Sequence, residues 1–516
     1  MINSFKILAN SLLALGLLIN ADELRSQTSG KNHDAFKKRL ARFENQVDDL
    51  RTLLKIPGLS AVVIKNQEVL WAKGFGYADV ENRIAATPDT VYHIASLTKT
   101  FAAELVMQLV EQGRLDLDEP ASHYSSDFKD DSVKIKHLLS HTSGDDRTPP
   151  GERYQYNADR FEYLTKVIEK KIGKPFREVV VETFLDPLGM SSSVPGHNVV
   201  EEADKWVGQL GKENLDRYAK NLSRLSQPYT LYGDGEVIHV SYPPKDFFGA
   251  AAGLLSTVLD MAKYDAAIDR HVFLKKATQE KAWTTFVSNS GQPLAHGLGW
   301  FVTDYHGIRL IWHYGDWGTG FSAIYLKVPE KNLSLIILGN SEAVSDHQFQ
   351  VGDDITNNVF ACVFLRLFVF EDARLLPDPR WTLNTQEFSS EIARLSKQSN
   401  GYAYDCERNS QTALAKWRED RRSHARVTIQ VDPKILEQYV GQYQYNPTRV
   451  LTVTRESNKL LVDIPRKHKS ELFAESESKF FLKESPVQVT FIKDDGQVTD
   501  MDVVADGQTV RAKRIK

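Results

Sequence analysis

A serine and a lysine three positions apart begin an apolar-striped segment near residue 100. Ser96 and Lys99 stand in the run SLTK, and Phe101, Leu105 and Leu109 follow on one helical stripe. At this spacing both side chains leave a helix on the same face, with their Cβ atoms about 5–6 Å apart. The positive N-terminal end of the helix also favours negative charge on the serine oxygen. The pair therefore has the make-up of a nucleophile and its proton acceptor.

A serine hydroxyl is a weak nucleophile at neutral pH and needs a base within reach. Lysine can be that base only where burial or nearby positive charge lowers its pKa, and tyrosine only where a cation lowers its own pKa. The chain has no Gly-x-Ser-x-Gly sequence, so the Ser-His-Asp plan of the α/β-hydrolases is not indicated. The alternative is that the serine and the lysine are two ordinary polar residues of a helix.

The Ser-x-x-Lys spacing occurs at two further places. Ser126 and Lys129 lie in the polar run HYSSDFKDDS, and Ser476 and Lys479 lie in the charged run ESESKFF. Neither pair begins a long apolar-striped helix. The motif alone is weak, and its setting singles out Ser96.

Five stretches in order resemble the class C β-lactamase-related serine hydrolases: SLTK, LLSHTSG, ERYQYNADRFEYLTKVIEKKIGKPF, AAAGLLST and WHYGDWGTGFSAIYLKVPE. This penicillin-recognising family also includes D-Ala-D-Ala carboxypeptidases, D-aminopeptidases and esterases. The resemblance runs from about residue 35 to 370, and the co-occurrence of its parts is more specific than any one of them. It implies a β-lactamase/transpeptidase-like fold and an acyl-enzyme.

The resemblance implies that Ser96 is the acylated nucleophile and Lys99 its proton-handling partner. Aligning VIEKKIGKPF with the helix after the family's Tyr-x-Asn motif makes Tyr156 that tyrosine, which the resemblance implies is the base for Ser96 and the acid for the leaving group. Tyr154 takes that place if the register slips by two residues. The alternative interpretation is that Tyr156, one of nineteen tyrosines in the chain, is an ordinary core or surface residue.

The third family motif, Lys-Thr-Gly in many relatives, reads His313-Tyr314-Gly315 here. Gly315 would let the substrate backbone approach the strand. The resemblance implies that the N–H groups of Ser96 and Asp316 form an oxyanion hole, and two such donors lower the barrier to acyl transfer by several kcal/mol.

Two residues depart from the family pattern. Ala158 stands where the Tyr-x-Asn motif expects asparagine, and Asn157 comes one place early. The amide that would hold a substrate's acylamino group is therefore expected to be absent from its usual position, with Asn157 as the remaining candidate for substrate binding. His313 replaces a lysine, so we expect a weaker, pH-dependent positive charge for a substrate carboxylate. Both changes favour esterase or peptidase activity over efficient β-lactam hydrolysis.

LLSHTSG also belongs to the resemblance, and we interpret it as a structural turn. His141, Asp145 and Asp146 have the residue types of a metal site but no helical ligand spacing. We therefore expect no metal and no cofactor.

The surrounding sequence indicates an α+β fold, with an antiparallel sheet flanked by helices plus a helical domain. Apolar residues at spacings of three and four predict helices, and β-rich runs around short turns predict hairpins. The helices are expected over 34–54, 160–176 and 359–370, and the hairpins over 59–78 and 321–340.

The chain divides into four expected parts. Residues 1–21 have the shape of a secretory signal peptide, with Lys6, an apolar run of about a dozen residues and Ala21. The hydrolase-like domain is expected over 34–372, a helical linker over 373–432 and a small all-β domain over 433–516. The apolar run is short for a membrane span, and an uncleaved anchor or a buried helix is the alternative to export to the periplasm or medium.

The balance of 64 basic and 68 acidic residues gives a net charge of −4, which gives no electrostatic case for nucleic acid as a partner. Cys362 and Cys406 lack the spacing of a zinc site or a redox pair. They are either buried thiols or one bridge, and Cys362 lies in an apolar stretch where a thiol is common.

The sequence thus predicts an exported serine hydrolase that acts on a small ester, a D-amino-acid peptide or a β-lactam, with peptidoglycan-derived peptides among the candidate substrates. The alternative is a penicillin-binding-type or cell-wall-binding protein with little or no turnover, in which Ala158 marks the loss of turnover. The sequence does not choose among the substrates, because substrate contacts come from loops.

Overall fold

The structure of the chain is a computed structural model. It describes residues 36–128, 131–145, 147–233, 235–346, 354–370, 402–424, 426–446, 449–463, 469–483, 487–505 and 508–516. The predicted signal peptide lies outside these ranges, as do Lys129, Asp146 and the predicted linker before residue 402. Within the described ranges no helix has the length and apolarity that a membrane span needs.

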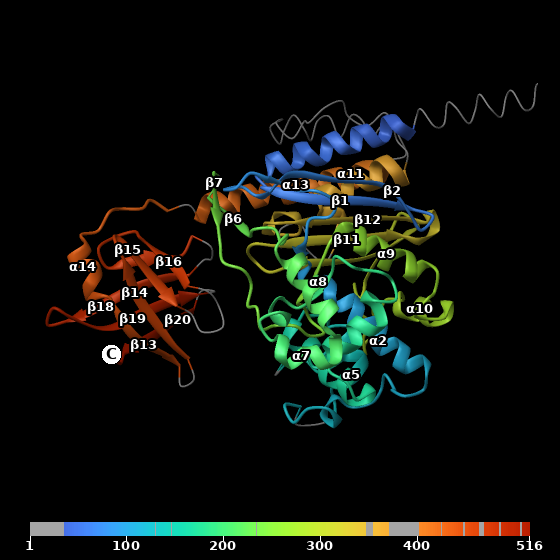
Figure 1. Ribbon diagram of the computed structural model, residues 1–516, viewed down its shortest axis with the longest axis horizontal. Coiled ribbons are helices and arrows are strands. Elements are labelled where there is room, and N and C mark those ends of the chain that lie inside the picture. Colours follow the sequence, from blue (N-terminus) through green and yellow to red (C-terminus); the bar gives the residue numbers. More distant parts are fainter. Residues whose placement is uncertain are drawn as a thin grey trace, which may run out of the picture.

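A seven-stranded antiparallel sheet forms the centre of the larger domain (Figure 1). Its order is β3-β2-β1-β12-β11-β10-β9, so the chain's first strands lie beside its last. The bounds are β1 (Gly58–Lys65), β2 (Glu68–Asp79), β3 (Ile84–Ala85), β9 (Phe301–Tyr305), β10 (Ile308–Asp316), β11 (Ser322–Val328) and β12 (Leu333–Gly339). Both predicted hairpins are confirmed as the pairs β1–β2 and β11–β12.

Both faces of the sheet are covered, so its inner strands are apolar on both sides. Side chains alternate across a strand, and in β1 Ala61 and Val63 pack with the helix at residues 36–53, whereas Val62 and Ile64 pack with the helical domain. The first face also carries α11 (Val359–Phe364), which confirms the predicted covering helix, and α13 (Tyr402–His424). Figure 1 shows these helices above the sheet and the helical domain below it.

The helical domain contains α2 (Thr98–Glu111), α3 (Ile135–Leu139), α4 (Ala158–Glu162), α5 (Leu164–Ile172), α6 (Phe176–Val180), α7 (Ala203–Leu210), α8 (Lys212–Leu222), α9 (Val258–Asp269) and α10 (Lys276–Ala282). The helix predicted over 160–176 is therefore two helices. The break falls at Tyr163, whose N–H bonds to the carbonyl of Arg160 three residues back and tightens the turn. The predicted end at Gly173 is confirmed, with a left-handed φ of 84°.

A small sheet of order β4-β8-β5 connects the central sheet to the helical domain. Its strands are β4 (Tyr92–His93), β5 (Val194–Pro195) and β8 (Leu254–Ser256). Because β4 precedes Ser96 and β8 follows Ala251, the pairing of Tyr92 with Ser256 brings two distant segments together.

The C-terminal domain is a closed barrel, which confirms the predicted small all-β domain. After α14 (Pro433–Gln438) come β13 (Gly441–Asn446), β14 (Arg449–Glu456), β15 (Lys459–Asp463), β16 (Lys469–Ala474), β17 (Lys479–Phe481), β18 (Gln488–Asp494), β19 (Gln497–Ala505) and β20 (Gln508–Arg514). The hairpin of β6 (Tyr229–Tyr232) and β7 (Glu236–His239) reaches the barrel through an ion pair of 2.6 Å between Glu236 and Lys483.

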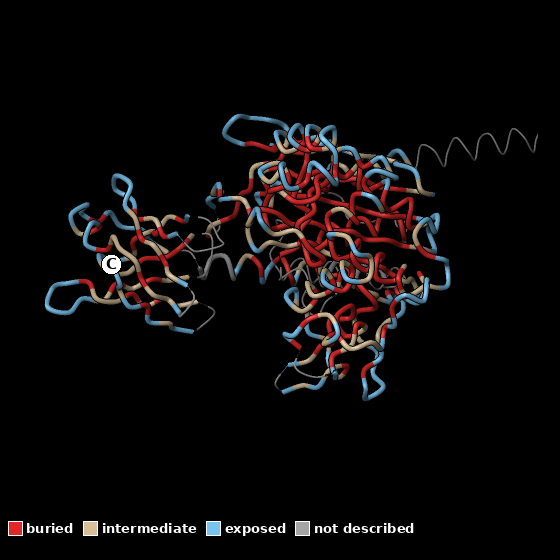
Figure 2. The backbone as a smooth tube through the Cα atoms, turned by 60° about the horizontal axis from the view of Figure 1, so that its bottom comes forward, coloured by how far each residue is buried: buried red, intermediate tan, exposed pale blue. Residues whose placement is uncertain are grey.

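The described end of the predicted linker contributes to the core of the larger domain. In α13, Cys406, Leu414 and Trp417 are buried in the cluster that also holds α11. Cys362 and Cys406 are both free buried thiols. Figure 2 shows how densely buried residues fill the larger domain, where the site described below is located.

A buried ion pair joins α9 to the central sheet. The Lys327 ammonium lies 2.5 Å from the carboxylate of Asp265 and 2.8 Å from that of Asp269, and its side chain is 1% exposed. Removing one partner of such a pair leaves an uncompensated buried charge.

We predict that Lys327→Met lowers the free energy of unfolding by about 3–5 kcal/mol, because two carboxylates lose their cation. Urea denaturation followed by circular dichroism measures this. Lys212→Met is the matched control, since its pair with Asp216 is 80% and 67% exposed, and it should change the stability far less. Equal effects of the two substitutions would contradict the prediction.

Candidate active site

Ser96 lies in a strained turn between β4 and α2. The turn is the short 3-10 helix η1 (Ala95–Leu97), and Ala95 has a φ of 48°, which is uncommon for a residue other than glycine. The N–H of Ala95 donates to Nδ1 of His93 at 3.2 Å. Ser96 itself is 8% exposed. Such backbone strain persists only where the surrounding contacts hold it.

The Lys99 amine meets the Ser96 hydroxyl at the first turn of α2. Its Nζ lies 2.9 Å from Ser96 Oγ and donates to the carbonyl oxygen of Ala251 at 2.8 Å. The side chain is completely buried, and this burial lowers the pKa of Lys99 to about 7, while the carboxylates of Glu162 and Asp159 oppose the shift. An amine with this pKa can take up a hydroxyl proton near neutral pH.

Tyr156 reaches the same place from the start of α4. The Lys99 Nζ lies 5.1 Å from the centre of its ring. The ring stacks on His141 at 4.3 Å and on Tyr314 at 5.4 Å between centroids. The fold thus brings Lys99 into contact with both the Ser96 hydroxyl and the ring of Tyr156. The ring of Tyr154 packs against His296 and Phe301.

The third motif lies on β10, directly beside the turn that contains Ser96. A Cβ at Gly315 would overlap the carbonyl oxygen of Ile94, so this contact needs glycine. The Gly315 carbonyl accepts from the Ser345 hydroxyl at 2.6 Å. The Asp316 carboxylate accepts from the N–H of Gly318 at 2.6 Å and so shapes the loop after β10.

A tryptophan ties that loop back to the turn. Trp317 Nε1 donates to Nδ1 of His93 at 2.7 Å, the same nitrogen that accepts from Ala95. Burial lowers the pKa of His93 to about 3, so its Nδ1 stays an acceptor at ordinary pH. The sequence alone does not single out His93 or Trp317, because the hydrogen bond between them joins positions that are 224 residues apart.

His313 lies at the site but differs from its expected role. It is fully buried, its Nδ1 bonds to the carbonyl of Tyr314 at 2.7 Å, and burial and then the neighbouring Lys99 hold its pKa well below the usual range. The imidazole is therefore neutral near pH 7 and does not offer the expected positive charge to a substrate carboxylate.

Asn157 also differs from its expected role. Its side-chain oxygen accepts from the N–H of Arg160 at 2.9 Å, so it caps α4. Its own N–H donates to Nδ1 of His141 at 3.1 Å. The amide oxygen is thus already used within the fold, and Asn157 supports the site by fixing the start of the helix that follows Tyr156.

His141 lies in a turn, as expected, and its ring also contacts Tyr156 at the site. It has a φ of 54°, and its ring packs on Tyr156 and on His296. Burial lowers the pKa of His296 to about 3 and that of His141 well below its usual range. Asp145 accepts from the N–H groups of Arg147 and Thr148, and the described part of the chain contains no cluster of three metal-ligating side chains.

The other Ser-x-x-Lys pairs have no comparable setting. Ser476 is exposed, its hydroxyl accepts from the backbone N–H of Lys479, and the lysine pairs with Glu475 at 3.0 Å. Ser126 is exposed, and Lys129 lies outside the described residues.

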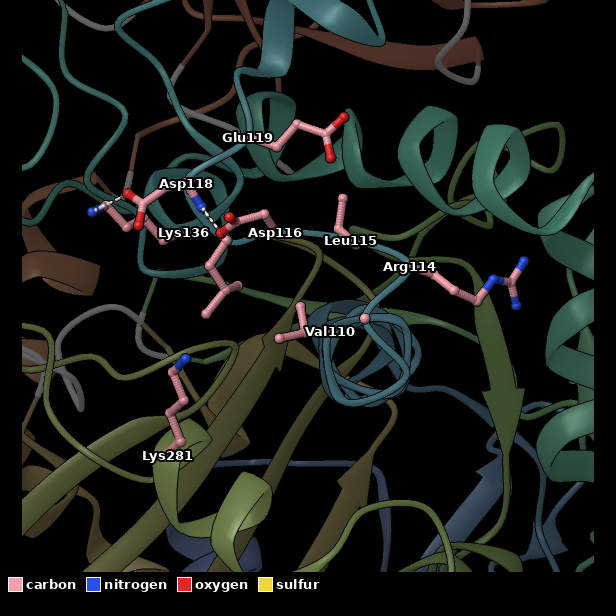
Figure 3. A pocket seen from close by; sticks show the side chains of 10 residues that line it. Val110, Arg114, Leu115, Asp116, Asp118, Glu119, Lys136 and Lys281 are labelled. Carbon is pink, nitrogen blue, oxygen red and sulfur yellow. Dashed lines mark hydrogen bonds and ion pairs between the residues drawn. The ribbon is translucent and has the colours of Figure 1, made fainter.

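A surface pocket lies at the opposite end of α2 from Ser96 (Figure 3). Asp118 and Lys136 form an ion pair of 2.6 Å across it, and the Asp118 N–H donates to Asp116 at 2.9 Å. None of the residues that line it belongs to the three motifs. We therefore do not assign the reaction to this pocket.

Comparison with known families gives two matches along the chain. Residues 43–350 match the family described as Beta-lactamase. Residues 425–514, which include the barrel, match a domain of unknown function, DUF3471.

Individual relatives cover much of the chain at low identity. Penicillin-binding protein 4* of Bacillus subtilis (strain 168) is 22% identical over 92% of this chain and 100% of its own length. Protein flp of Staphylococcus aureus (strain MRSA252) is 25% identical over 55% of this chain and 60% of its own length. The structure of the octameric penicillin-binding protein homologue from Pyrococcus abyssi has a TM-score of 0.54 at 21% identity, over 92% of this chain and all of that one, and supports the fold.

We predict that Gly315→Ala slows covalent labelling of Ser96 by a fluorophosphonate at least tenfold, because the added methyl group pushes β10 away from Ile94. Intact-protein mass spectrometry over time measures the labelling. Gly208→Ala is the control, since a Cβ there meets no atom within 4 Å. A Gly315→Ala protein that labels as fast as the wild type would contradict the close approach.

Proposed function

The chain belongs to the beta-lactamase family, whose match covers more than half of its 516 residues, and from this premise we propose that it is a serine hydrolase that cleaves an ester or an amide through an acyl-enzyme. The family resemblance of the motifs is thereby confirmed. The observation that carries the proposal is the contact of 2.9 Å between a fully buried lysine amine and the Ser96 hydroxyl.

In the proposed acylation, Ser96 Oγ forms a bond to the carbonyl carbon of the substrate. The hydroxyl proton passes to the Lys99 amine. The bond between the carbonyl carbon and the leaving oxygen or nitrogen then breaks, and Tyr156 gives its proton to the leaving alcohol or amine. The N–H groups of Ser96 and Asp316 would hold the negative oxygen of the tetrahedral intermediate. The position of Gly315 against the nucleophile's turn supports this role for the residue that follows it.

In the proposed deacylation, a water molecule adds to the acyl carbon and gives up its proton to Tyr156. The bond between the acyl carbon and Ser96 Oγ then breaks, and Lys99 returns a proton to the serine. Each group ends in its starting state, so the cycle needs no further reactant beyond water.

The neutral state of His313 supports substrates that carry no carboxylate next to the scissile bond. A buried neutral imidazole offers little attraction to such a group, and burial holds the pKa of His313 low. We therefore propose neutral esters or amides ahead of β-lactams. Export after removal of residues 1–21 stays part of the proposal, as do cell-wall peptides that are cleaved at a bond with no neighbouring carboxylate.

A penicillin-binding protein that acylates without turnover is the second candidate. The similarity to penicillin-binding protein 4*, which extends over that relative's whole length, favours it. The use of the Asn157 side chain to cap α4 favours it as well. A burst of product from a p-nitrophenyl ester without a steady rate would support this candidate over the hydrolase.

We predict that a fluorophosphonate adds once to the wild-type protein and not to Ser96→Ala, and that benzylpenicillin, which carries a carboxylate, adds far more slowly. Intact-protein mass spectrometry measures both. Tyr156→Phe should lower the turnover of a p-nitrophenyl ester by about 10²–10⁴-fold, the range typical of a lost proton-transfer group. Adducts that persist in Ser96→Ala would remove Ser96 from the mechanism.

The pH dependence of labelling tests the lysine. Below about pH 7 the Lys99 amine holds its proton and cannot accept that of Ser96, since burial sets its pKa to about 7. The labelling rate should therefore rise about tenfold per pH unit up to neutrality and then level off. Lys99→Met should label slowly and without this acid limb. A wild-type rate that shows no such limb between pH 5 and 9 would contradict the role of Lys99.

A further inference from the structure

The carbonyl that holds the Lys99 amine belongs to a short segment with two further anchors. Ala251 accepts from Lys99 Nζ at 2.8 Å through its carbonyl oxygen. Its N–H donates to the Glu162 carboxylate at 2.9 Å, and the N–H of Ala250 donates to the Thr165 hydroxyl at 2.7 Å. Two side chains from consecutive helices, α4 and α5, thus hold the backbone that contacts the lysine.

The two anchors are bound to each other. The Thr165 hydroxyl donates to Oε1 of Glu162 at 2.7 Å, and Oε2 of the same carboxylate accepts from Ala251. A Cβ at Gly249 would overlap this carboxylate, so the segment approaches Glu162 as closely as glycine allows. Both carboxylate oxygens have partners, which fixes the orientation of the group.

We propose that Glu162 is a positioning residue for Lys99, because its carboxylate fixes the backbone at Ala251, whose carbonyl oxygen holds the amine, and places a negative charge near that amine. This inference rests on the proposed function of Ser96 and Lys99. Thr165 completes the arrangement by orienting the carboxylate.

The charges around the amine support an electrostatic part of this role. From the elements packed against Lys99 come the carboxylates of Glu162 and Asp159 and the imidazoles of His141, His296 and His313. Burial lowers the pKa of all three imidazoles, that of His296 to about 3, so their neutral form is favoured near neutral pH. The carboxylates therefore carry the negative charge that opposes the effect of burial on Lys99.

Glu162 itself is held by more than one partner. Burial raises the pKa of Glu162, whereas its bonds to Ala251 and Thr165 and the charge of Lys99 act in the opposite direction. Glu169 is the further acidic neighbour, and its carboxylate accepts from the N–H of Phe176 at 2.8 Å. Of these two glutamates, Glu162 is the one whose charge acts on Lys99.

The experiment measures the pH dependence of Ser96 labelling by a fluorophosphonate in the full chain. Glu162→Gln removes the charge that favours the ammonium form of Lys99, so its pKa falls and the acid limb moves to lower pH, by about half a unit to one unit. Thr165→Val keeps the charge but loosens the carboxylate, so the plateau rate falls about two- to tenfold with a smaller shift of the limb. The control Glu169→Gln, in α5, also removes one negative charge. It should leave the plateau rate and the position of the acid limb unchanged.

The outcomes separate this inference from the proposed function. A wild-type protein whose Ser96 is not labelled would overturn the proposed function and the inference with it. Labelling of the wild type together with an unmoved limb in Glu162→Gln would overturn the inference alone, even if the rate falls equally at every pH, because that result indicates a merely structural role. If Glu162→Gln does not fold, Thr165→Val decides the question. A plateau labelling rate equal to that of the wild type then overturns the inference.

Discussion

The burial of one amine is the constraint on which the candidate site depends. An ammonium group is costly to remove from water, and a completely buried one lowers its pKa rather than stay charged without a partner. Lys99 has no exposed surface, and its pKa of about 7 follows from that burial. The carboxylates of Glu162 and Asp159 keep the shift from going further. The fold thereby supplies a base near neutral pH without a histidine in that role.

The two-faced sheet makes this burial possible. Because its strands are covered on both sides, β10 can bring Gly315 against the turn of Ser96 while helices close over the lysine. The same packing holds Ala95 in its left-handed conformation, with His93 and Trp317 tying the turn to the loop after β10. In the proposed reaction, rigidity of this kind keeps Ser96 and Lys99 in register.

Local patterns in the sequence predict most elements, but not the polar network between them. The alternation of apolar and polar residues indicates the hairpins correctly, and the 3.6-residue apolar period indicates the helices correctly. Each pattern is complete within about a dozen residues. The break at Tyr163 is missed because the apolar period continues through it. Glu162 is missed because its partner Ala251 is 89 residues away, and no spacing rule relates two such positions. Ser96, Lys99 and Tyr156 are found by the resemblance, which carries long-range information that periodicity lacks.

At Asn157 and His313, the local hydrogen bonds and burial indicate a different role from the one that the family resemblance implies. An asparagine directly before Ala-Asp-Arg-Phe is a typical N-cap, and that signal competes with its assignment to the substrate. Glu162 lies at the end of the helix that Asn157 caps. Its carboxylate accepts from the N–H of Ala251, the residue whose carbonyl holds Lys99. His313 occupies a strand position that is buried, so replacing a lysine there removes a charge rather than weakening it. The two departures from the family pattern therefore act together. The charges that act on Lys99 belong to the protein's own carboxylates, and in the proposed reaction backbone N–H groups hold the substrate's oxygen.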